Sequence, residues 1–147
     1  MKSEKLRAGH PHPIVKLKEL IKYDNVSAEV KCMKESVLAE KTMDFATDIV
    51  TLADELKMNK EFIISSQIGR SGTSIGANVY EADYAASRAD FVNKLRIALK
   101  EANETLYWLN LLLRTNKIDK DNFDKLNENC NAIRAMLIKS IKTADKK

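Results

Sequence analysis

The chain has 147 residues, of which 44% are hydrophobic and 31% are charged, and its formal net charge is +4 at pH 7. This size and balance predict one globular domain with a substantial core. No stretch approaches the ~18 consecutive apolar residues of a membrane-spanning helix, and the first residues lack the apolar segment of a secretory signal. We therefore expect a cytoplasmic protein that has no membrane partner and keeps its two cysteines, Cys32 and Cys130, reduced.

The composition also favours an all-α fold. The chain contains only two prolines and four glycines, and no run of alternating β-branched residues is bounded by turn signals. Its charge is unevenly distributed, because residues 86–147 carry thirteen basic and eight acidic side chains. A basic half of this kind points to an anionic partner.

Residues 1–34 are predicted to form an N-terminal arm, flexible apart from one short helix. Pro13 is suited to the first turn of a helix, and four apolar residues follow it at helical spacing, namely Ile14, Leu17, Leu20 and Ile21. His10 and His12 form a His-x-His pair, which suggests a metal site, but no further ligands lie near them. An exposed polar turn is therefore the favoured interpretation.

Residues 35–145 are predicted to form the bundle, beginning with two helices. The first spans about Ser36 to Leu56, and its apolar face is Leu38, Phe45, Ile49, Leu52 and Leu56. The second spans about Lys60 to Tyr84 with Asn59 as its N-cap. Three glycines interrupt the helical pattern of the second, at Gly69, Gly72 and Gly76. We expect them to permit close approach of a neighbouring helix. A glycine-rich phosphate loop is the alternative, but GRSGTSIG lacks the GxxxxGK[ST] pattern and a preceding strand.

Two longer helices follow. Ser87 with Asp90 resembles a capping box and starts a helix that continues to about Arg114, with Asn116 as its left-handed C-terminal residue. Its predicted core face is Phe91, Leu95, Ala98, Ala102, Thr105, Leu109 and Leu112. Asp119 is the expected N-cap of the last helix, whose apolar face is Phe123, Leu126, Cys130, Ile133, Leu137 and Ile141. Four amphipathic helices with short links predict an antiparallel up-down-up-down bundle.

The third helix carries more apolar surface than one chain can cover. Its last turns, LYWLNLLL, are apolar nearly all the way round, and such a helix in a small soluble protein needs a partner chain as well as its own core. We therefore expect a homo-oligomer whose interface includes Trp108, Leu111 and Leu113.

The sequence offers no arrangement typical of an enzyme, a metal site or a cofactor site. Glu81, Glu101 and Glu104 invite comparison with di-iron bundles, but these need histidine ligands within the helices, and both histidines lie outside. No histidine is placed to activate a serine or Cys130. Asn78 and Glu81 lie one turn apart and are expected to share a partner, with Glu81 forming a polar clamp to Arg70 or to the third helix. Direct contact with a ligand is the alternative.

One face of the third helix is basic and contains no acid. This basic stripe follows three-four spacing through Asn93, Arg96, Lys100, Asn103, Tyr107, Asn110 and Arg114. We expect phosphate contacts from six cations, Arg70, Arg88, Lys94, Arg96, Lys100 and Arg114. Tyr107 is a candidate for stacking on a base. For a single subunit a plain solvated face is the favoured interpretation. In an oligomer the balance shifts towards binding, because symmetry repeats the stripe.

Three segments together resemble the four-helix-bundle family of 23S ribosomal-RNA intervening-sequence proteins. They are SSQIGRSGTSIGANVYEA (65–82), SRADF (87–91) and IALKEANETLYWLNLL (97–112). The chain is also similar to the accessory variability proteins of diversity-generating retroelements. Arg70, Asn78 and Glu81 match the motif of the second helix, and Glu101, Glu104 and Trp108 match that of the third.

The resemblance implies a ring-like homopentamer with a basic surface that binds nucleic acid, and in the retroelement members a reverse transcriptase as partner. It implies no catalytic residues. Residues 1 to about 30 extend beyond the usual start of the family pattern. Two hypotheses follow: an oligomeric accessory protein that binds RNA or DNA, and a protein-interaction scaffold with no direct nucleic-acid role.

Overall fold

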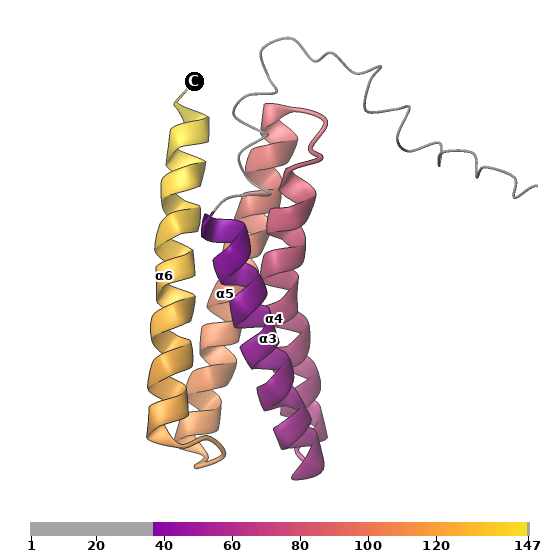
Figure 1. Ribbon diagram of the computed structural model, residues 1–147, viewed down its shortest axis with the longest axis vertical. Coiled ribbons are helices and arrows are strands. Elements are labelled where there is room, and N and C mark those ends of the chain that lie inside the picture. Colours follow the sequence, from indigo (N-terminus) through magenta and orange to yellow (C-terminus); the bar gives the residue numbers. More distant parts are fainter. Residues whose placement is uncertain (1–36, 147) are drawn as a thin grey trace, which may run out of the picture.

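The computed structural model describes residues 37–146, and within this range it consists of four helices and no strands. With the labels of Figure 1, these are α3 (Val37–Met58), α4 (Phe62–Ala82), α5 (Arg88–Arg114) and α6 (Lys120–Asp145). The prediction of an all-α fold with four bundle helices is confirmed. The expectations for the N-terminal arm, the two histidines and Cys32 fall on residues outside the described range.

The four helices lie side by side along one long axis (Figure 1). α4 packs against α3 and α5, and α6 packs against α5 and, less extensively, against α3. The connecting segments 59–61, 83–87 and 115–119 are short, which keeps consecutive helices next to each other. No helix in residues 37–146 combines the length and the apolar run needed to cross a membrane.

The core forms where the apolar faces of the four helices meet. All six apolar residues predicted for α6 are buried, as are the five predicted for α3: Leu38, Phe45, Ile49, Leu52 and Leu56. On α5, Leu95, Ala98, Ala102, Leu109 and Leu112 are buried as expected. Each fully buried large side chain contributes about 1.5–3 kcal/mol, so these periodic faces supply most of the driving force for the fold.

The glycines of α4 allow α3 to approach closely, as predicted. A Cβ atom added at Gly72 would lie 2.7 Å from Cγ2 of Ile49, and one added at Gly76 would lie 3.4 Å from the backbone oxygen of Thr42. None of the described glycines has a positive φ angle. Their role is therefore to leave space between α3 and α4.

Two helix starts are capped by the predicted residues. The Ser87 Oγ atom accepts a hydrogen bond from the Asp90 backbone N–H at 3.1 Å, and an Asp90 carboxylate oxygen accepts one from the Ala86 N–H at 3.2 Å. Asp119 Oδ1 accepts a hydrogen bond from the Asn122 N–H at 2.9 Å. These bonds satisfy donors that have no partner in the first turn.

The predicted start of α4 was wrong, because Asn59 lies in the turn that ends α3. Lys60 has a φ angle of 64°, its N–H donates to Lys57 O at 3.0 Å, and the Glu61 N–H donates to Leu56 O at 2.9 Å. This is a Schellman motif, and the end of α5 repeats it at Asn116, which has the predicted left-handed φ of 54°. A lysine rarely takes this conformation, so no residue pattern predicted this turn.

Candidate nucleic-acid interface

The basic stripe of α5 is exposed along its whole length. Each of its seven residues is solvent-exposed, and Tyr107 retains 61% of its accessible surface. Arg96 Nη2 lies 2.9 Å from Asp145 Oδ2 of α6. Lys100 and Arg114 have no ion-pair partner within residues 37–146. The stripe can therefore present cationic and amide donors, and one aromatic ring, to an external ligand.

Two other predicted phosphate contacts already have acidic partners in the α4–α5 seam. Arg70 of α4 donates a hydrogen bond to Glu104 of α5, and its Nη1 atom lies 3.6 Å from Glu101 Oε2. Lys94 Nζ lies 2.6 Å from Glu81 Oε2. The hydrogen bond to Glu81, followed by the negative charge of that residue, raises the pKa of Lys94.

The predicted polar clamp of Glu81 to the third helix is thus confirmed, and Lys94 is the residue it binds. The expectation that Asn78 shares this partner is wrong. Asn78 Nδ2 donates instead to the backbone oxygen of Ser74 at 2.9 Å and to Ser74 Oγ at 3.2 Å. Because Asn78 sits one turn before Glu81 and nearer the core, its amide is satisfied by its own helix.

The centre of the α4–α5 seam is a buried polar cluster. Thr105 Oγ1 donates to Ser71 Oγ at 2.9 Å, which joins the two helices inside the core. Glu101 is buried one turn away, and its Oε2 atom accepts no hydrogen bond. The nearby Arg70 guanidinium compensates this carboxylate, so Arg70 also stabilises the helix pair. Arg88, the first residue of α5, is exposed.

An apolar cluster lies at the end of this seam that faces the α3–α4 link. The contact of Arg70 with Glu104 sets the register between α4 and α5. Ile63 lies two turns before Arg70 on α4, and Leu111 lies two turns after Glu104 on α5. These two residues therefore lie on the same side of the helix pair and at the same level along it. Trp108, one turn before Leu111, is half-buried; its Nε1–H donates to Glu104 Oε1 at 3.4 Å, and its ring meets that of Tyr107 edge-on at 4.9 Å. We define the apolar cluster as Ile63, Tyr107, Trp108 and Leu111. Ile63 is 78% exposed. The apolar cluster is therefore an uncovered surface of the single chain.

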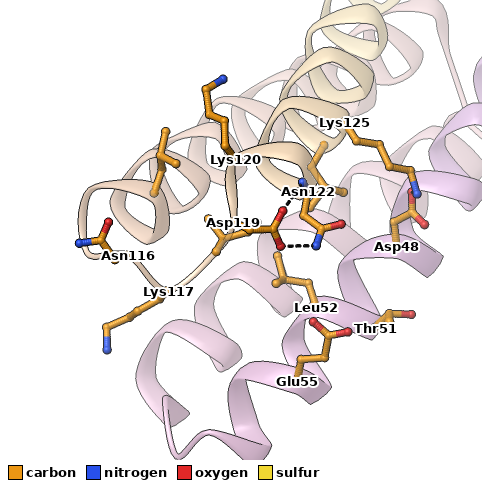
Figure 2. Close-up of a pocket in the computed structure, with 13 residues that line it drawn as sticks. Asp48, Thr51, Leu52, Glu55, Asn116, Lys117, Asp119, Lys120, Asn122 and Lys125 are labelled. Atoms are coloured by element: carbon orange, nitrogen blue, oxygen red, sulfur yellow. Dashed lines mark hydrogen bonds and ion pairs between the residues drawn. The ribbon is translucent and has the colours of Figure 1, made fainter.

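Leu113, predicted to share that interface, lies on the other side of α5. It lines a pocket of about 680 Å³ formed by α3, the α5–α6 link and the start of α6. Figure 2 shows Asp119 and Asn122 on one side of this pocket and Leu52 and Glu55 of α3 on the other. The structure thus places Trp108 and Leu111 together and separates Leu113 from both.

A row of lysines at the end of α6 is a second basic feature, which was not among the predicted phosphate contacts. Lys139, Lys142 and Lys146 follow the same three-four spacing as the basic stripe, and all are exposed. None of them forms an ion pair within the described part of the chain. Asp145 lies beside this lysine row, and its bond to Arg96 brings the row next to the start of the basic stripe. The spacing of these lysines is visible in the sequence, but their position next to α5 is not.

The described residues provide no centre for metal or thiol chemistry. No group of three or more His, Cys, Asp or Glu side chains within residues 37–146 is arranged to hold a metal ion. Burial raises the pKa of the Cys130 thiol to about 12, only partly offset by the positive charge of Arg134. The thiol is therefore protonated at neutral pH, and its Sγ atom lies 3.5 Å from the backbone oxygen of Ala102 in the core.

Comparison with known proteins identifies the family. The family model described as "23S rRNA-intervening sequence protein" matches residues 34–139. The chain belongs to this family. The intervening-sequence match covers α3, α4, α5 and most of α6, so the three segments quoted for the resemblance all lie inside it.

A crystal structure shares the fold of this intervening-sequence family member. It is a protein of unknown function from the S23 ribosomal protein family of Bacteroides thetaiotaomicron, with 53% sequence identity and a TM-score of 0.70. The alignment covers 72% of this chain and 96% of that protein. No curated protein matches the chain.

Proposed function

We propose that this protein is a non-enzymatic nucleic-acid-binding protein that acts as a homo-oligomer. The observation that supports binding is the basic face, which we define as the basic stripe of α5 together with the lysine row of α6. The five cations Lys100, Arg114, Lys139, Lys142 and Lys146 on this face have no internal partner in residues 37–146. Asp145, bound to Arg96, is the acid that separates the two rows.

The geometry of the basic face suits a polyanion. Arg96 and Arg114 are eighteen residues apart, which corresponds to about 27 Å along a helix. Three cations over that length, with a parallel row of lysines beside them, can contact several phosphates of one strand or duplex. Tyr107, near the middle of the stripe, provides an exposed ring for stacking on an unpaired base.

The structure leads us to divide the sequence-predicted contacts into two groups. In this proposal Arg96, Lys100 and Arg114 contact phosphates directly. Arg70 and Lys94 serve first to hold α4 to α5 through Glu104 and Glu81. A cation already paired with a carboxylate gains less from a phosphate, because the existing partner must be displaced or repelled.

Oligomerisation forms the second part of the proposal. We propose an antiparallel up-down-up-down bundle that associates through the apolar cluster, since large aromatic and aliphatic side chains dominate interface energetics. From the resemblance described above we further propose that the oligomer is a pentamer and that a reverse transcriptase is a binding partner. An oligomer repeats the basic face on every subunit, so weak contacts add to a usable affinity.

The test is the binding of the purified protein to labelled structured RNA and to duplex DNA across a salt titration. Affinity should fall steeply with salt, and the log-log slope should decrease by about 0.9 for each phosphate contact that is lost from duplex DNA. The double variant Arg96→Glu/Lys100→Glu should therefore bind weakly and with a smaller slope.

The matched control is Lys41→Glu/Lys57→Glu, which makes the same change in net charge at exposed positions of α3. The control should lose much less affinity than the α5 variant. Equal losses in the two variants would mean that net charge alone governs binding and would overturn the proposed basic face. An oligomer that binds neither RNA nor DNA at low salt would overturn the nucleic-acid function itself.

A protein-interaction scaffold is the second candidate function, and the apolar cluster favours it. Ile63 and Tyr107 are exposed beside Trp108 and Leu111, and such a patch is typical of a surface that another protein covers. Under this function, substitutions in the apolar cluster abolish partner binding while charge reversals on the basic face leave it unchanged.

A further inference from the structure

Arg134 of α6 is a cation that the basic face defined above does not include. Among the Lys and Arg side chains of residues 37–146, only Arg134 and Lys94 are half-buried. Lys94 has Glu81 as its partner, whereas no carboxylate in this range lies within ion-pair distance of Arg134. The nearest acid along the chain, Glu128, is six residues away and so points to a different side of α6. A half-buried cation without a carboxylate is costly to keep, so an acceptor supplied by a ligand would be stabilising here.

Two asparagines hold Arg134 in place of an acid. Its Nη1 atom donates to Asn131 Oδ1 at 2.8 Å, and Asn131 Nδ2 donates in turn to the backbone oxygen of Asn127 at 2.9 Å. The Nε–H of Arg134 is buried and donates to no acceptor among the described residues. The guanidinium is therefore oriented, but one of its donors is unsatisfied. Because Nε is covered in the free protein, the side chain must rotate to present this donor to a ligand.

The register between α5 and α6 places Arg134 beside the basic stripe. Cys130 Sγ lies 3.5 Å from the backbone oxygen of Ala102. A long side chain on a helix leans towards the preceding turn, so the guanidinium of Arg134 lies near the level of Cys130. Consistent with this position, the positive charge of Arg134 partly offsets the rise in the pKa of Cys130 that burial causes. Asn103 follows Ala102 on α5, and Tyr107 follows one turn later, so both stripe residues lie near this level.

Four asparagines occupy the middle of the surface where α5 and α6 adjoin. Asn103 lies seven residues after Arg96, and Asn131 lies fourteen residues before Asp145. Because Arg96 and Asp145 contact each other, these asparagines share the sides of α5 and α6 that face each other at the surface. Asn103 is exposed and forms no hydrogen bond within residues 37–146. The amide band, as we define it, consists of Asn103, Asn110, Asn127 and Asn131.

The groups in this region suit a nucleobase better than a further phosphate. Asparagine amides and an arginine guanidinium form paired hydrogen bonds with base edges, whereas a neutral amide offers no net charge to a phosphate. The ring of Tyr107 is exposed and is held by its edge-on contact with Trp108 at 4.9 Å, and such a ring can stack on any base. Cations lie on both sides, with Arg96 and Lys142 towards one end of the bundle and Arg114 towards the other. The phosphates that flank the base would therefore also find partners.

This surface is too wide to enter the groove of a duplex. An α-helix with its side chains is about 10 Å across, so two helices side by side span about 20 Å, whereas the major groove of DNA is about 12 Å wide. The major groove of an RNA duplex is narrower still. We infer that Arg134, Tyr107 and the amide band form a site for an unpaired nucleotide, so that the protein binds single strands in preference to duplexes. This inference rests on the proposed nucleic-acid function and specifies its ligand.

The test compares two labelled probes at one moderate salt concentration. One is a single-stranded RNA of about twelve nucleotides without self-complementarity, and the other is the duplex of the same RNA with its complement. The wild-type protein should bind the single strand at least about fivefold more tightly, as expected for one stacked base. A wild-type protein that binds the duplex as tightly as the single strand would overturn the inference.

Substitutions at Arg134 separate base recognition from charge. Arg134→Gln should weaken binding of the single strand about tenfold, as for the loss of one paired contact to a base, and should change duplex binding much less. Arg134→Lys keeps the charge but loses the planar guanidinium, so it should not restore the preference for the single strand. The matched control, Lys142→Gln, removes one positive charge from the lysine row and should weaken binding of both probes equally.

The ratio of the two affinities decides between the outcomes. Equal losses on both probes in Arg134→Gln, or full preference restored by Arg134→Lys, would overturn the inference and leave the nucleic-acid function standing. Binding of neither probe at low salt would overturn both. Because Arg134 is half-buried, circular dichroism checks the helicity of its variants. Asn103→Ala, at an exposed position without an internal bond, gives an independent test, since an unchanged preference in this variant would also contradict the site.

Discussion

Arg96 of α5 is bound to Asp145 of α6 through a 2.9 Å contact between Nη2 and Oδ2. This bond joins the basic stripe to the lysine row and at the same time places an acid within the basic face. Both side chains are substantially exposed, so the pair contributes little to stability. Its main consequence under the proposed function is electrostatic, because Asp145 would compete with a phosphate for Arg96.

Replacing Asp145 with Asn should therefore strengthen nucleic-acid binding. An exposed ion pair of about 0.4–1 kcal/mol corresponds to a gain of about two- to fivefold in affinity at low salt. The measurement is a titration of labelled RNA or DNA with both proteins. Asp54→Asn removes one negative charge from an exposed position of α3 and serves as the control. An equal gain in affinity in both variants would show that the loss of one negative charge, and not the release of Arg96 from Asp145, strengthens binding.

Reversal of two lysines on α6 tests whether the basic face is continuous. Lys139→Glu/Lys142→Glu should weaken binding and lower the salt slope about as much as the Arg96→Glu/Lys100→Glu variant, since each removes two phosphate contacts. Circular dichroism checks that helicity is retained. Unchanged affinity in the α6 variant would restrict the interface to α5.

Trp108→Ala should dissociate the proposed oligomer, because Trp108 is the largest side chain of the apolar cluster. The measurement is the mass in solution, by light scattering after size exclusion, across a dilution series. Tyr84→Ala truncates another exposed aromatic side chain outside the cluster and should keep the wild-type mass. A Trp108→Ala protein of unchanged mass would exclude the apolar cluster as the subunit interface.

Gly72→Ala should destabilise the bundle despite the better helix propensity of alanine. A Cβ at this position would meet Cγ2 and Cγ1 of Ile49 at 2.7 and 2.9 Å, and a β-branched side chain in a helix has few alternative rotamers. Overpacking costs about 1–3 kcal/mol, against a propensity gain of about 1 kcal/mol.

The neighbouring Gly69→Ala is the matched control for this prediction. Its added Cβ would lie 3.5 Å from Ala53 Cβ, an ordinary contact distance, so this variant should be as stable as the wild type or more stable by about 1 kcal/mol. Urea unfolding of both variants measures the difference. Equal stabilities would contradict the close approach of α3 and α4 at Gly72.

Removal of the α6 cap should produce a pH-dependent loss of stability. The backbone and side-chain hydrogen bonds from Asn122 lower the pKa of Asp119 below its usual value. A lowered pKa in the folded state means that the carboxylate contributes stability above about pH 4, and that this contribution disappears as pH falls through the folded-state pKa.

Asp119→Ala should therefore lower the thermal midpoint at pH 7, and the difference from the wild type should shrink as the pH falls through the lowered pKa of Asp119. Thermal unfolding followed by circular dichroism at several pH values measures this difference. Asp121→Ala, in the same first turn of α6, retains the cap and should show a smaller effect. A difference that is constant with pH would mean that the charge of Asp119 is not what stabilises the helix.

Helices, caps and core faces could be predicted from the sequence because they depend on local order. Residues at three-four spacing share a helix face whatever the neighbouring element is, so Leu95 and Leu137 were assigned to the core correctly. Ser87 and Asp119 cap helices through bonds to residues three positions ahead. These interactions need no knowledge of other parts of the chain.

The partners of the candidate site residues were decided by the tertiary structure, because they depend on the register between helices. The contacts of Gly72 with Ile49 and of Ser71 with Thr105 set the heights of α3, α4 and α5. That register pairs Arg70 with Glu104, a relationship that spacing within a single helix does not contain. It also decides which cations stay available to a ligand.

The positions of the apolar surfaces of α5 also depend on how the helices pack. Trp108 and Leu113 are five residues apart in one apolar run, yet the arrangement of the helices around α5 assigns one to the apolar cluster and the other to the pocket. The order of residues along the chain already indicates that α5 has more apolar surface than one neighbour can bury and that α6 ends in lysines. Only the packing of α3 and α6 around α5 decided where these surfaces lie, because distances between helices arise from side chains far apart in the chain.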